Sequence, residues 1–274
     1  MNSRFLLRAA GALVLTAGLV FAQKAPKQPK PKSQKEVDAI NAVFSATDPD
    51  ARIAAAENLL TKFADTEFKA VVLQVAAASA QQKNDFEKMV IYSERTIEAD
   101  PQNYPAMLML ANGIAQKTRE FDLDKEEKLQ RSEKYARQSI ELIGTATKPR
   151  PDITDEQWEG AKKDYLAQAH EALGLTAMVR KKYDVAATEF KTSTDVAPMP
   201  DQATLVRLAA AYNLSGKPDL AIPVLDKVMA IPDLNPQIKQ VAQNERVNAM
   251  KLKSGGVKPA AGAAPPPQVE VKKP

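Results

Sequence analysis

The sequence predicts an all-α protein built from stacked helical hairpins. The chain of 274 residues has only 10 glycines and 5% aromatic residues, and it is rich in Ala, Leu, Lys, Glu and Gln, which favour helices. No segment shows alternating β-branched residues bounded by glycine-containing turns, so the signals of a β-sheet are missing. One pattern of apolar and small residues occurs twice, 35 residues apart, and such a period is typical of helical repeats.

The repeated pattern lies in the C-terminal half of the chain. Its apolar and small positions recur in the same order: Leu173-Gly174, Tyr183, Ala186 and Phe190 return as Leu208-Ala209, Pro218, Ala221 and Leu225. One apolar side of each hairpin cannot be buried within that hairpin, so neighbouring hairpins must stack. The expected product is an elongated solenoid with a concave face, a shape suited to binding.

The first 22 residues have the features of a signal peptide. Arg4 and Arg8 precede an apolar run of 14 residues that ends at Ala22. This run is shorter than the roughly 20 residues with which a helix crosses a bilayer, and Val20 and Ala22 are small enough for signal peptidase. We expect cleavage near Ala22 and a periplasmic or extracellular protein, with a retained anchor as the alternative.

Two basic segments flank the predicted folded region. Residues 23–32 form a Lys/Pro-rich linker, and residues 254–274 form an Ala/Pro/Lys tail that we expect to be disordered. The net charge of +4 comes from these segments, because the body between them is acidic. We therefore expect no nucleic-acid binding, and at most a weak, salt-sensitive contact of the basic tails with anionic membrane or wall polymer.

Start signals divide the folded region into two sets of hairpins. Ser33 to Glu36 and Thr154 to Gln157 each fit a capping box, which begins a helix. We expect N-terminal hairpins over residues 33–144, a proline-containing break over 145–153, and C-terminal hairpins over 154–253.

Two further features are expected within these sets of hairpins. An insertion at about 118–131 should lengthen both helices of its hairpin. Asn235-Pro236 should begin a capping helix that closes the apolar end of the stack.

The pattern Leu173-Gly174, Tyr183, Ala186, Phe190 and Pro198 resembles the tetratricopeptide repeat (TPR). In that family small residues lie where two helices cross, and a proline ends the second helix. The resemblance is good over residues 167–235 and moderate over residues 70–103. It implies a right-handed α-solenoid of antiparallel hairpins, in which the first helix of each hairpin lines the concave groove.

The resemblance also implies which residues line the groove. The positions concerned are mostly amides and aliphatic residues: Gln74, Ala78, Gln81, Leu108, Asn112, Glu171, Leu175, Met178, Ala210 and Asn213. Family members that grip acidic chaperone tails have Lys and Arg at these places. We therefore expect a protein or peptide partner, but not one bound through its C-terminal carboxylate.

Reactive clusters are missing from the sequence. There is no cysteine, and His170 is the single histidine, so thiol chemistry and a metal site of several histidines are excluded. We expect His170 to be a packed or groove-rim residue and not part of a Ser-His-Asp triad. Asp122, Asp124, Glu126 and Glu127 lack the glycine and distal glutamate of a calcium loop, and no glycine-rich phosphate loop is present. We predict no catalytic residue, no metal site and no cofactor.

The predicted function is a non-enzymatic protein-interaction scaffold of the cell envelope. Two alternatives remain open at this stage. The first is a membrane- or wall-tethered assembly factor that uses the basic tails. The second is an enzyme with an unrecognised carboxylate site.

Overall fold

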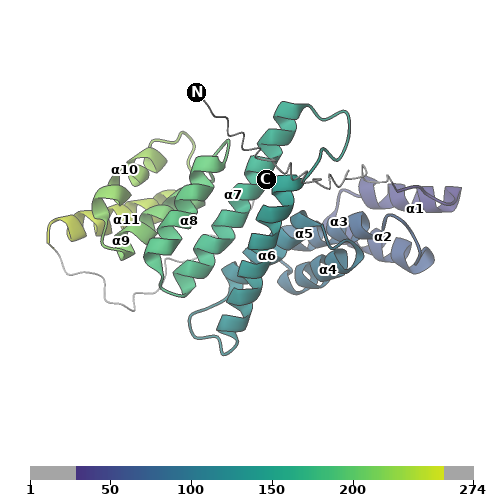
Figure 1. Ribbon diagram of the computed structural model, residues 1–274, viewed down its shortest axis with the longest axis horizontal. Coiled ribbons are helices and arrows are strands. Elements are labelled where there is room, and N and C mark those ends of the chain that lie inside the picture. The colour runs from purple at the N-terminus through teal and green to yellow at the C-terminus, as the bar shows by residue number, and fades with distance from the viewer. Residues whose placement is uncertain (1–28, 256–274) are drawn as a thin grey trace, which may run out of the picture.

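The computed structural model describes residues 29–255, and in this range it contains eleven α-helices and no β-strand (Figure 1). The predicted signal segment 1–22, linker residues 23–28 and tail residues 256–274 lie outside the described residues. The helices are α1 (Gln34–Ser45), α2 (Pro49–Lys62), α3 (Lys69–Gln82), α4 (Phe86–Ala99), α5 (Tyr104–Lys117), α6 (Lys125–Thr145), α7 (Asp155–Val179), α8 (Tyr183–Val196), α9 (Gln202–Leu214), α10 (Pro218–Met229) and α11 (Pro236–Lys253).

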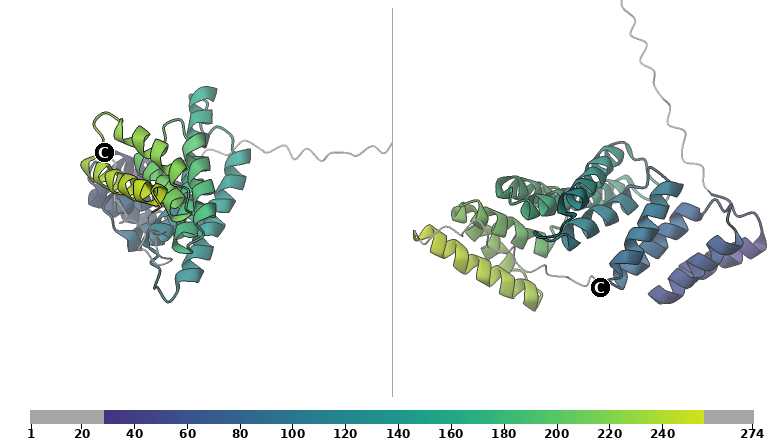
Figure 2. Two further views of the ribbon diagram at one scale, coloured as in Figure 1. Left: turned by 90° about the vertical axis from the view of Figure 1, so that its left-hand side faces the viewer. Right: turned by 90° about the horizontal axis from the view of Figure 1, so that it is seen from below.

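Each helix packs against the next one in the chain, from α1 to α11. In addition, α5 packs on α7 and α9 packs on α11, so first helices of hairpins meet across the stack. Figure 2 shows the resulting curved row, with α1 and α11 at opposite ends. The prediction of an all-α solenoid is confirmed, and the segment 145–153 does not interrupt the packing because α6 and α7 lie against each other across it.

The two predicted capping boxes form differently. At α7, the Thr154 hydroxyl accepts a hydrogen bond from Gln157 N at 3.1 Å, and the Gln157 side chain accepts one from Thr154 N at 3.0 Å. At α1, Ser33 accepts a hydrogen bond from Glu36 N at 3.2 Å. The Glu36 carboxylate accepts a hydrogen bond from Lys32 N at 2.6 Å instead of from Ser33 N. Only one of the two hydrogen bonds of this capping box therefore forms.

The insertion lengthens one helix of its hairpin, not both. Helix α6 has 21 residues, whereas α5 has 14 residues and stops at Lys117. The expectation for α5 was wrong because Thr118 adopts an extended conformation (φ −73°, ψ 127°) and ends the helix. Helix α7 continues without a break for 25 residues, through Gly160.

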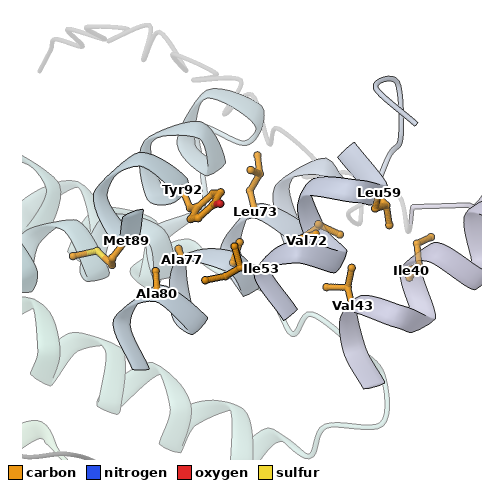
Figure 3. Close-up of a cluster of buried hydrophobic side chains, with 12 residues drawn as sticks. Ile40, Val43, Ile53, Leu59, Val72, Leu73, Ala77, Ala80, Met89 and Tyr92 are labelled. Carbon is orange, nitrogen blue, oxygen red and sulfur yellow. The ribbon is translucent and has the colours of Figure 1, made fainter. Parts of the chain in front are cut away.

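The N-terminal helices share one apolar core (Figure 3). Val43 of α1, Leu59 of α2, and Val72 and Leu73 of α3 are each 0% exposed and belong to the same cluster of buried side chains. Complete burial of one such side chain contributes about 1.5–3 kcal/mol. No hairpin could bury these residues alone, which is the physical reason for the stack.

Several ion pairs join residues whose separation in the sequence is close to the repeat length of 35 residues. Arg207 pairs with Glu171 at 2.6 Å and Lys217 with Asp184 at 2.8 Å, and further pairs link Lys83 to Asp50, Arg95 to Glu57 and Arg131 to Glu94. The partners are 33 to 38 residues apart. This separation places them at equivalent positions of successive hairpins, so it follows directly from the repeat.

The last residues of the predicted linker are tied to the fold. Lys30 N donates to Glu67 at 3.0 Å, and the Lys32 ammonium pairs with Asp65 at 2.5 Å. Both partners lie in the α2–α3 connection. The solvated spacer expected over residues 23–32 is thus anchored at its C-terminal end.

Glu36 gives the N-terminal end a predicted pH dependence. Its side chain is 1% exposed, and hydrogen bonds from the Thr66 hydroxyl and Lys32 N lower the pKa of Glu36 below its ordinary 4.5. A carboxyl with a lowered folded-state pKa stabilises the fold above 4.5, and this contribution is lost as the pH falls through the folded-state value. The hydrogen-exchange protection factors of α1, which compare the observed rate with the intrinsic rate at the same pH, should therefore fall in that acidic range.

Glu36→Gln is the variant that tests this assignment. Its α1 protection factors should be lower than those of the parent at neutral pH and should fall little further in acid. Asp38→Asn, on an exposed side chain of the same helix, should behave like the parent. Equal acid sensitivity in the parent and the Glu36→Gln protein would refute the assignment.

Candidate functional site

The ten predicted groove residues fall into two groups. Gln74, Ala78, Gln81, Asn112 and Glu171 are exposed or half-buried. Five others are buried, with at most 8% of each residue exposed: Leu108, Leu175, Met178, Ala210 and Asn213. In this structure these five side chains belong to the core, so they are not available to a partner.

Packing between first helices explains the burial of the second group. Leu108 of α5 lies in one cluster with Ile143 of α6 and Ala169 of α7. Leu175 and Met178 of α7 share a cluster with Ala115 of α5 and Leu208 of α9. At the C-terminal end, α11 packs on α9 and closes over Ala210 and Asn213. The face that the TPR resemblance assigns to a groove is used here to join hairpins.

Two of the half-buried residues also link helices. Asn112 donates from Nδ2 to the carbonyl oxygens of Leu108 and Gln168, each at 3.1 Å, and so connects α5 to α7. Glu171 and Arg207 form their ion pair with 17% exposure on each side chain, which connects α7 to α9. Both residues have a structural role, whatever else they contact.

Asn213 connects α9 to the closing helix. Its Nδ2 donates to the carbonyl oxygen of Glu245 at 3.0 Å and to the Glu245 carboxylate at 2.8 Å. Burial nevertheless raises the pKa of Glu245 above 4.5. The charged carboxylate is therefore disfavoured by its surroundings, despite the hydrogen bond from Asn213.

Glu245→Gln is expected to stabilise the protein at neutral pH. A raised folded-state pKa means that the contribution of Glu245 is greatest below 4.5 and declines as the pH rises toward the folded-state value. Glutamine keeps an acceptor for Asn213 and removes the cost of burying a charge. Thermal unfolding should show a higher midpoint for the variant at about pH 7 and no gain at about pH 3.5. A lower midpoint at neutral pH would contradict this account.

One predicted part of the groove does remain open. Gln74, Ala78 and Gln81 follow one face of α3, and Val71 extends the same face by one turn. Val71 is 38% exposed, and Gln74 accepts a hydrogen bond from Asn103 at 3.1 Å. We call these four residues the α3 surface. Sequence reasoning missed Val71, although its spacing of seven residues from Ala78 was the available signal.

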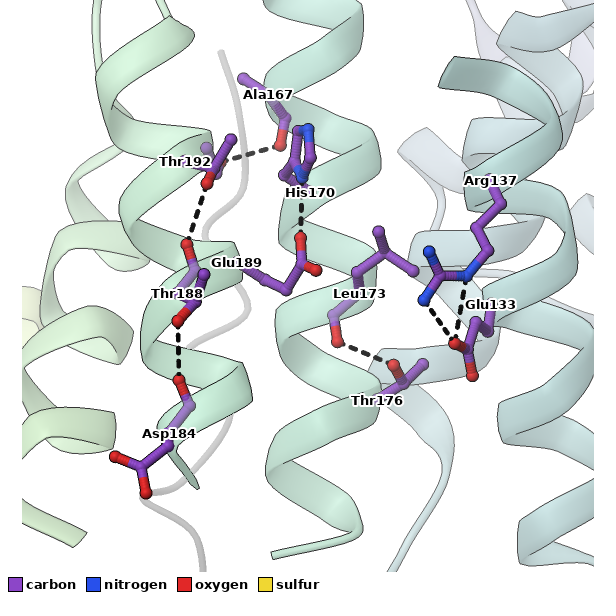
Figure 4. Close-up of polar contacts among 11 residues, drawn as sticks. Glu133, Arg137, Ala167, His170, Leu173, Thr176, Asp184, Thr188, Glu189 and Thr192 are labelled. Carbon is purple, nitrogen blue, oxygen red and sulfur yellow. Dashed lines mark hydrogen bonds and ion pairs between the residues drawn. The ribbon is translucent and has the colours of Figure 1, made fainter. Parts of the chain in front are cut away.

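His170 lies between α7 and α8. Its Nδ1 is 2.7 Å from the Glu189 carboxylate (Figure 4), and the two side chains are 23% and 20% exposed. Within residues 29–255, no three His, Cys, Asp or Glu side chains are grouped in a way that could hold a metal ion. Three of the four acidic residues considered from the sequence have cationic partners: Asp122 and Asp124 pair with Lys128, and Glu126 pairs with Arg180.

A polar cleft of about 670 Å³ lies where the α5–α6 turn meets the end of α7. Arg180 crosses it and pairs with Glu126 at 3.0 Å and with Glu133 at 2.8 Å. Lys181 pairs with Glu120 of the turn at 2.5 Å. Sequence reasoning did not identify this cleft, because one of its sides comes from the insertion before α6, which the repeat pattern does not describe.

Within residues 29–255, no helix has a stretch both long enough and apolar enough to cross a bilayer.

Comparison with known proteins adds to the structural description. No family model matches the sequence, and no curated protein sequence matches it. Among solved structures, the crystal structure of a thermophilic TPR protein from Thermus thermophilus is similar, with a TM-score of 0.51 and 12% sequence identity. The match covers 78% of this chain and 99% of that one. The chain therefore has the TPR-like fold that its repeat pattern implied.

Proposed function

We propose that this protein is a non-enzymatic scaffold that binds a protein or peptide through the α3 surface. The observation that carries the proposal is that Ala78 and Gln81 are exposed on a first helix, whereas the corresponding positions of α7 and α9 are buried. A TPR-like fold is compatible with this use, since stacked hairpins commonly present extended binding surfaces.

The α3 surface favours an extended, weakly charged segment. The amides of Gln74 and Gln81 can donate hydrogen bonds to a peptide backbone and accept them from it. Val71 offers apolar contact, and Ala78 is small enough for the ligand backbone to approach closely. Because the surface has no charged side chain of its own, binding should depend only weakly on salt.

The proposal is tested by crosslinking in intact cells. A photoreactive amino acid at Gln81 should capture a partner, whereas the same group at Glu87, an exposed residue of α4, should not. With the purified partner, Ala78→Arg should lower the affinity about tenfold or more, and Glu87→Arg should leave it unchanged. Equal capture at both positions, or unchanged affinity of Ala78→Arg with an intact fold, would refute the α3 surface as the binding site.

The ion pairs in the polar cleft beside the α5–α6 turn support the proposal that the protein is not an enzyme. Its three carboxylates, Glu120, Glu126 and Glu133, are each engaged by Lys181 or Arg180. A general acid or base needs a carboxyl with an environment that tunes its pKa toward neutrality. The hydrogen bonds from Arg137 and Arg180 instead lower the pKa of Glu133.

We further propose that the protein is exported and acts in the cell envelope. The support is the sequence of residues 1–22, with its basic start, short apolar run and small residues near Ala22. N-terminal sequencing of the protein purified from fractionated cells should give a start at or near Gln23, in the periplasmic or extracellular fraction. Recovery of the uncleaved chain from the cytoplasm would contradict export.

A further inference from the structure

The described part of the linker, residues 29–32, runs beside the α2–α3 connection in the opposite direction. Lys32 pairs with Asp65 at 2.5 Å, and two residues earlier Lys30 N donates to the Glu67 carboxylate at 3.0 Å. When the linker is followed back toward the N-terminus, its contacts therefore advance along the connection toward the start of α3. Residues 23–28 continue from a segment that leads to this helix.

The contact with Glu67 lies at one end of the α3 surface. Glu67 precedes Val71 by four residues, which is the spacing of one helical turn. It thus continues the row formed by Val71, Gln74, Ala78 and Gln81. The linker is therefore held where the surface that we assign to partner binding begins.

The linker outside the described residues has the length of this surface. An α-helix rises about 1.5 Å per residue, so Glu67 and Gln81 are about 21 Å apart along α3. A polyproline helix rises about 3.1 Å per residue, so the chain from Lys30 back to Gln23 spans about 22 Å. The proposed cleavage near Ala22 would leave Gln23 as the first residue of the chain.

The linker sequence also has two uncharged edges to offer to an uncharged surface. Every third residue is a lysine: Lys24, Lys27 and Lys30. Because a polyproline helix has three residues per turn, these lysines share one edge, and the Ala, Gln and Pro residues between them form the other two. Such a helix has no internal hydrogen bonds, so its carbonyl groups can accept hydrogen bonds from the side-chain amides of Gln74 and Gln81.

We propose that residues 23–28 lie along the α3 surface as a polyproline helix, with the lysine edge in water, and occupy this surface until a partner displaces them. The proposal rests on the function assigned to the α3 surface and adds the regulation of that site. A segment tethered by so few residues has an effective concentration of the order of millimolar. Contacts too weak to hold a free peptide can therefore hold this one.

Disulfide trapping tests the proposal, because the sequence has no cysteine and an introduced pair can form only one bridge within the chain. By the rises given above, Ala25 and Ala78 both lie about 16 Å from the Glu67 contact. Ala25→Cys with Ala78→Cys should therefore form a bridge under mild oxidation. In the control pair, Ala54→Cys replaces Ala78→Cys. Ala54 and Ala78 are both exposed, and each is eleven residues from the anchored connection, counted from Asp65 and from Glu67.

The bridge between positions 25 and 78 should form about tenfold faster than the bridge between positions 25 and 54. Intact mass after alkylation of the remaining thiols measures both rates. Equal rates would mean that the linker has no preference for α3, and a bridge that joins two chains would assign the surface to a second copy. Either result would overturn the proposal.

Partner binding provides a second readout. The protein bridged between positions 25 and 78 should bind the purified partner about tenfold more weakly than the same protein after reduction. Undiminished affinity of the bridged protein would contradict regulation by the linker. Equal bridging rates together with partner capture at Gln81 would refute the linker proposal alone, whereas preferential bridging without any capture at Gln81 would refute the binding function alone.

Discussion

Replacing Phe190 with alanine is expected to lower the free energy of unfolding by about 3–5 kcal/mol. Phe190 is 0% exposed, in the core cluster that joins α7, α8 and α9. Its ring lies against Gly174, where an added Cβ would be 2.5 Å from ring atom Cε1. Alanine would remove the ring and leave a cavity between hairpins that cannot collapse without shifting helices. Urea denaturation followed by circular dichroism measures the loss.

Two further variants separate this packing effect from a general sensitivity of α8. Val185 is 49% exposed on the same helix, so Val185→Ala should change stability by no more than about 0.5 kcal/mol. Gly174→Ala should cost about 1–3 kcal/mol when Phe190 is present, and much less in the Phe190→Ala protein, where the methyl group has room. A Phe190→Ala loss below about 1 kcal/mol, or additive effects of the pair, would contradict the packing described.

The repeat could be predicted because it depends on contacts within one hairpin and its neighbour. Gly174, Ala186 and Phe190 stand at fixed spacings, and the structure uses them as expected: a close helix crossing and a ring that fills it. The start of α7 could be predicted for the same reason, since a capping box involves only four consecutive residues. Such features need no knowledge of distant packing.

The open surface could not be predicted in the same way. The TPR resemblance assigns Leu108 and Met178 to the groove, yet they are buried because neighbouring first helices pack together. Whether a groove position stays open depends on helix lengths and on the angle between hairpins. The repeat pattern contains neither, and the insertion that lengthens α6 departs from it. The surviving surface on α3 therefore emerges only in three dimensions.

Phe121 and Leu123 illustrate a second limit. They are 88% and 108% exposed, in a charged insertion where the sequence gives no alternation or helical spacing, and the neighbouring Glu120 and Asp122 form ion pairs. The Glu120–Lys181 pair joins two successive hairpins, whereas Asp122 pairs with Lys128 of its own hairpin. The signal that could have been used was the presence of two large apolar residues in a segment with no apolar face to complete.

Removing the closing helix is expected to have the second large effect. A chain that ends at Asp233 lacks α11, whose Ile238, Ala242 and Ala249 are buried against α9 and α10. Burial of Ile238 alone is worth about 1.5–3 kcal/mol, and the truncation would also expose Leu225 and its neighbours. A loss of about 3 kcal/mol lowers the melting temperature of a domain this size by about 6–12 °C. Calorimetry should show that shift, and size-exclusion chromatography should show association through the exposed face.

The helices that are destabilised by removing α11 distinguish a solenoid from a single cooperative globule. In a stack, each hairpin contacts mainly its neighbours, so instability should stay near the cut. Hydrogen exchange should accelerate strongly in α9 and α10 and remain close to that of the parent in α3 and α4. A chain ending at Gly255 keeps α11 and should match the parent throughout. Uniform acceleration over the whole chain would mean that the hairpins do not act as separate units, and it would contradict the nearest-neighbour description.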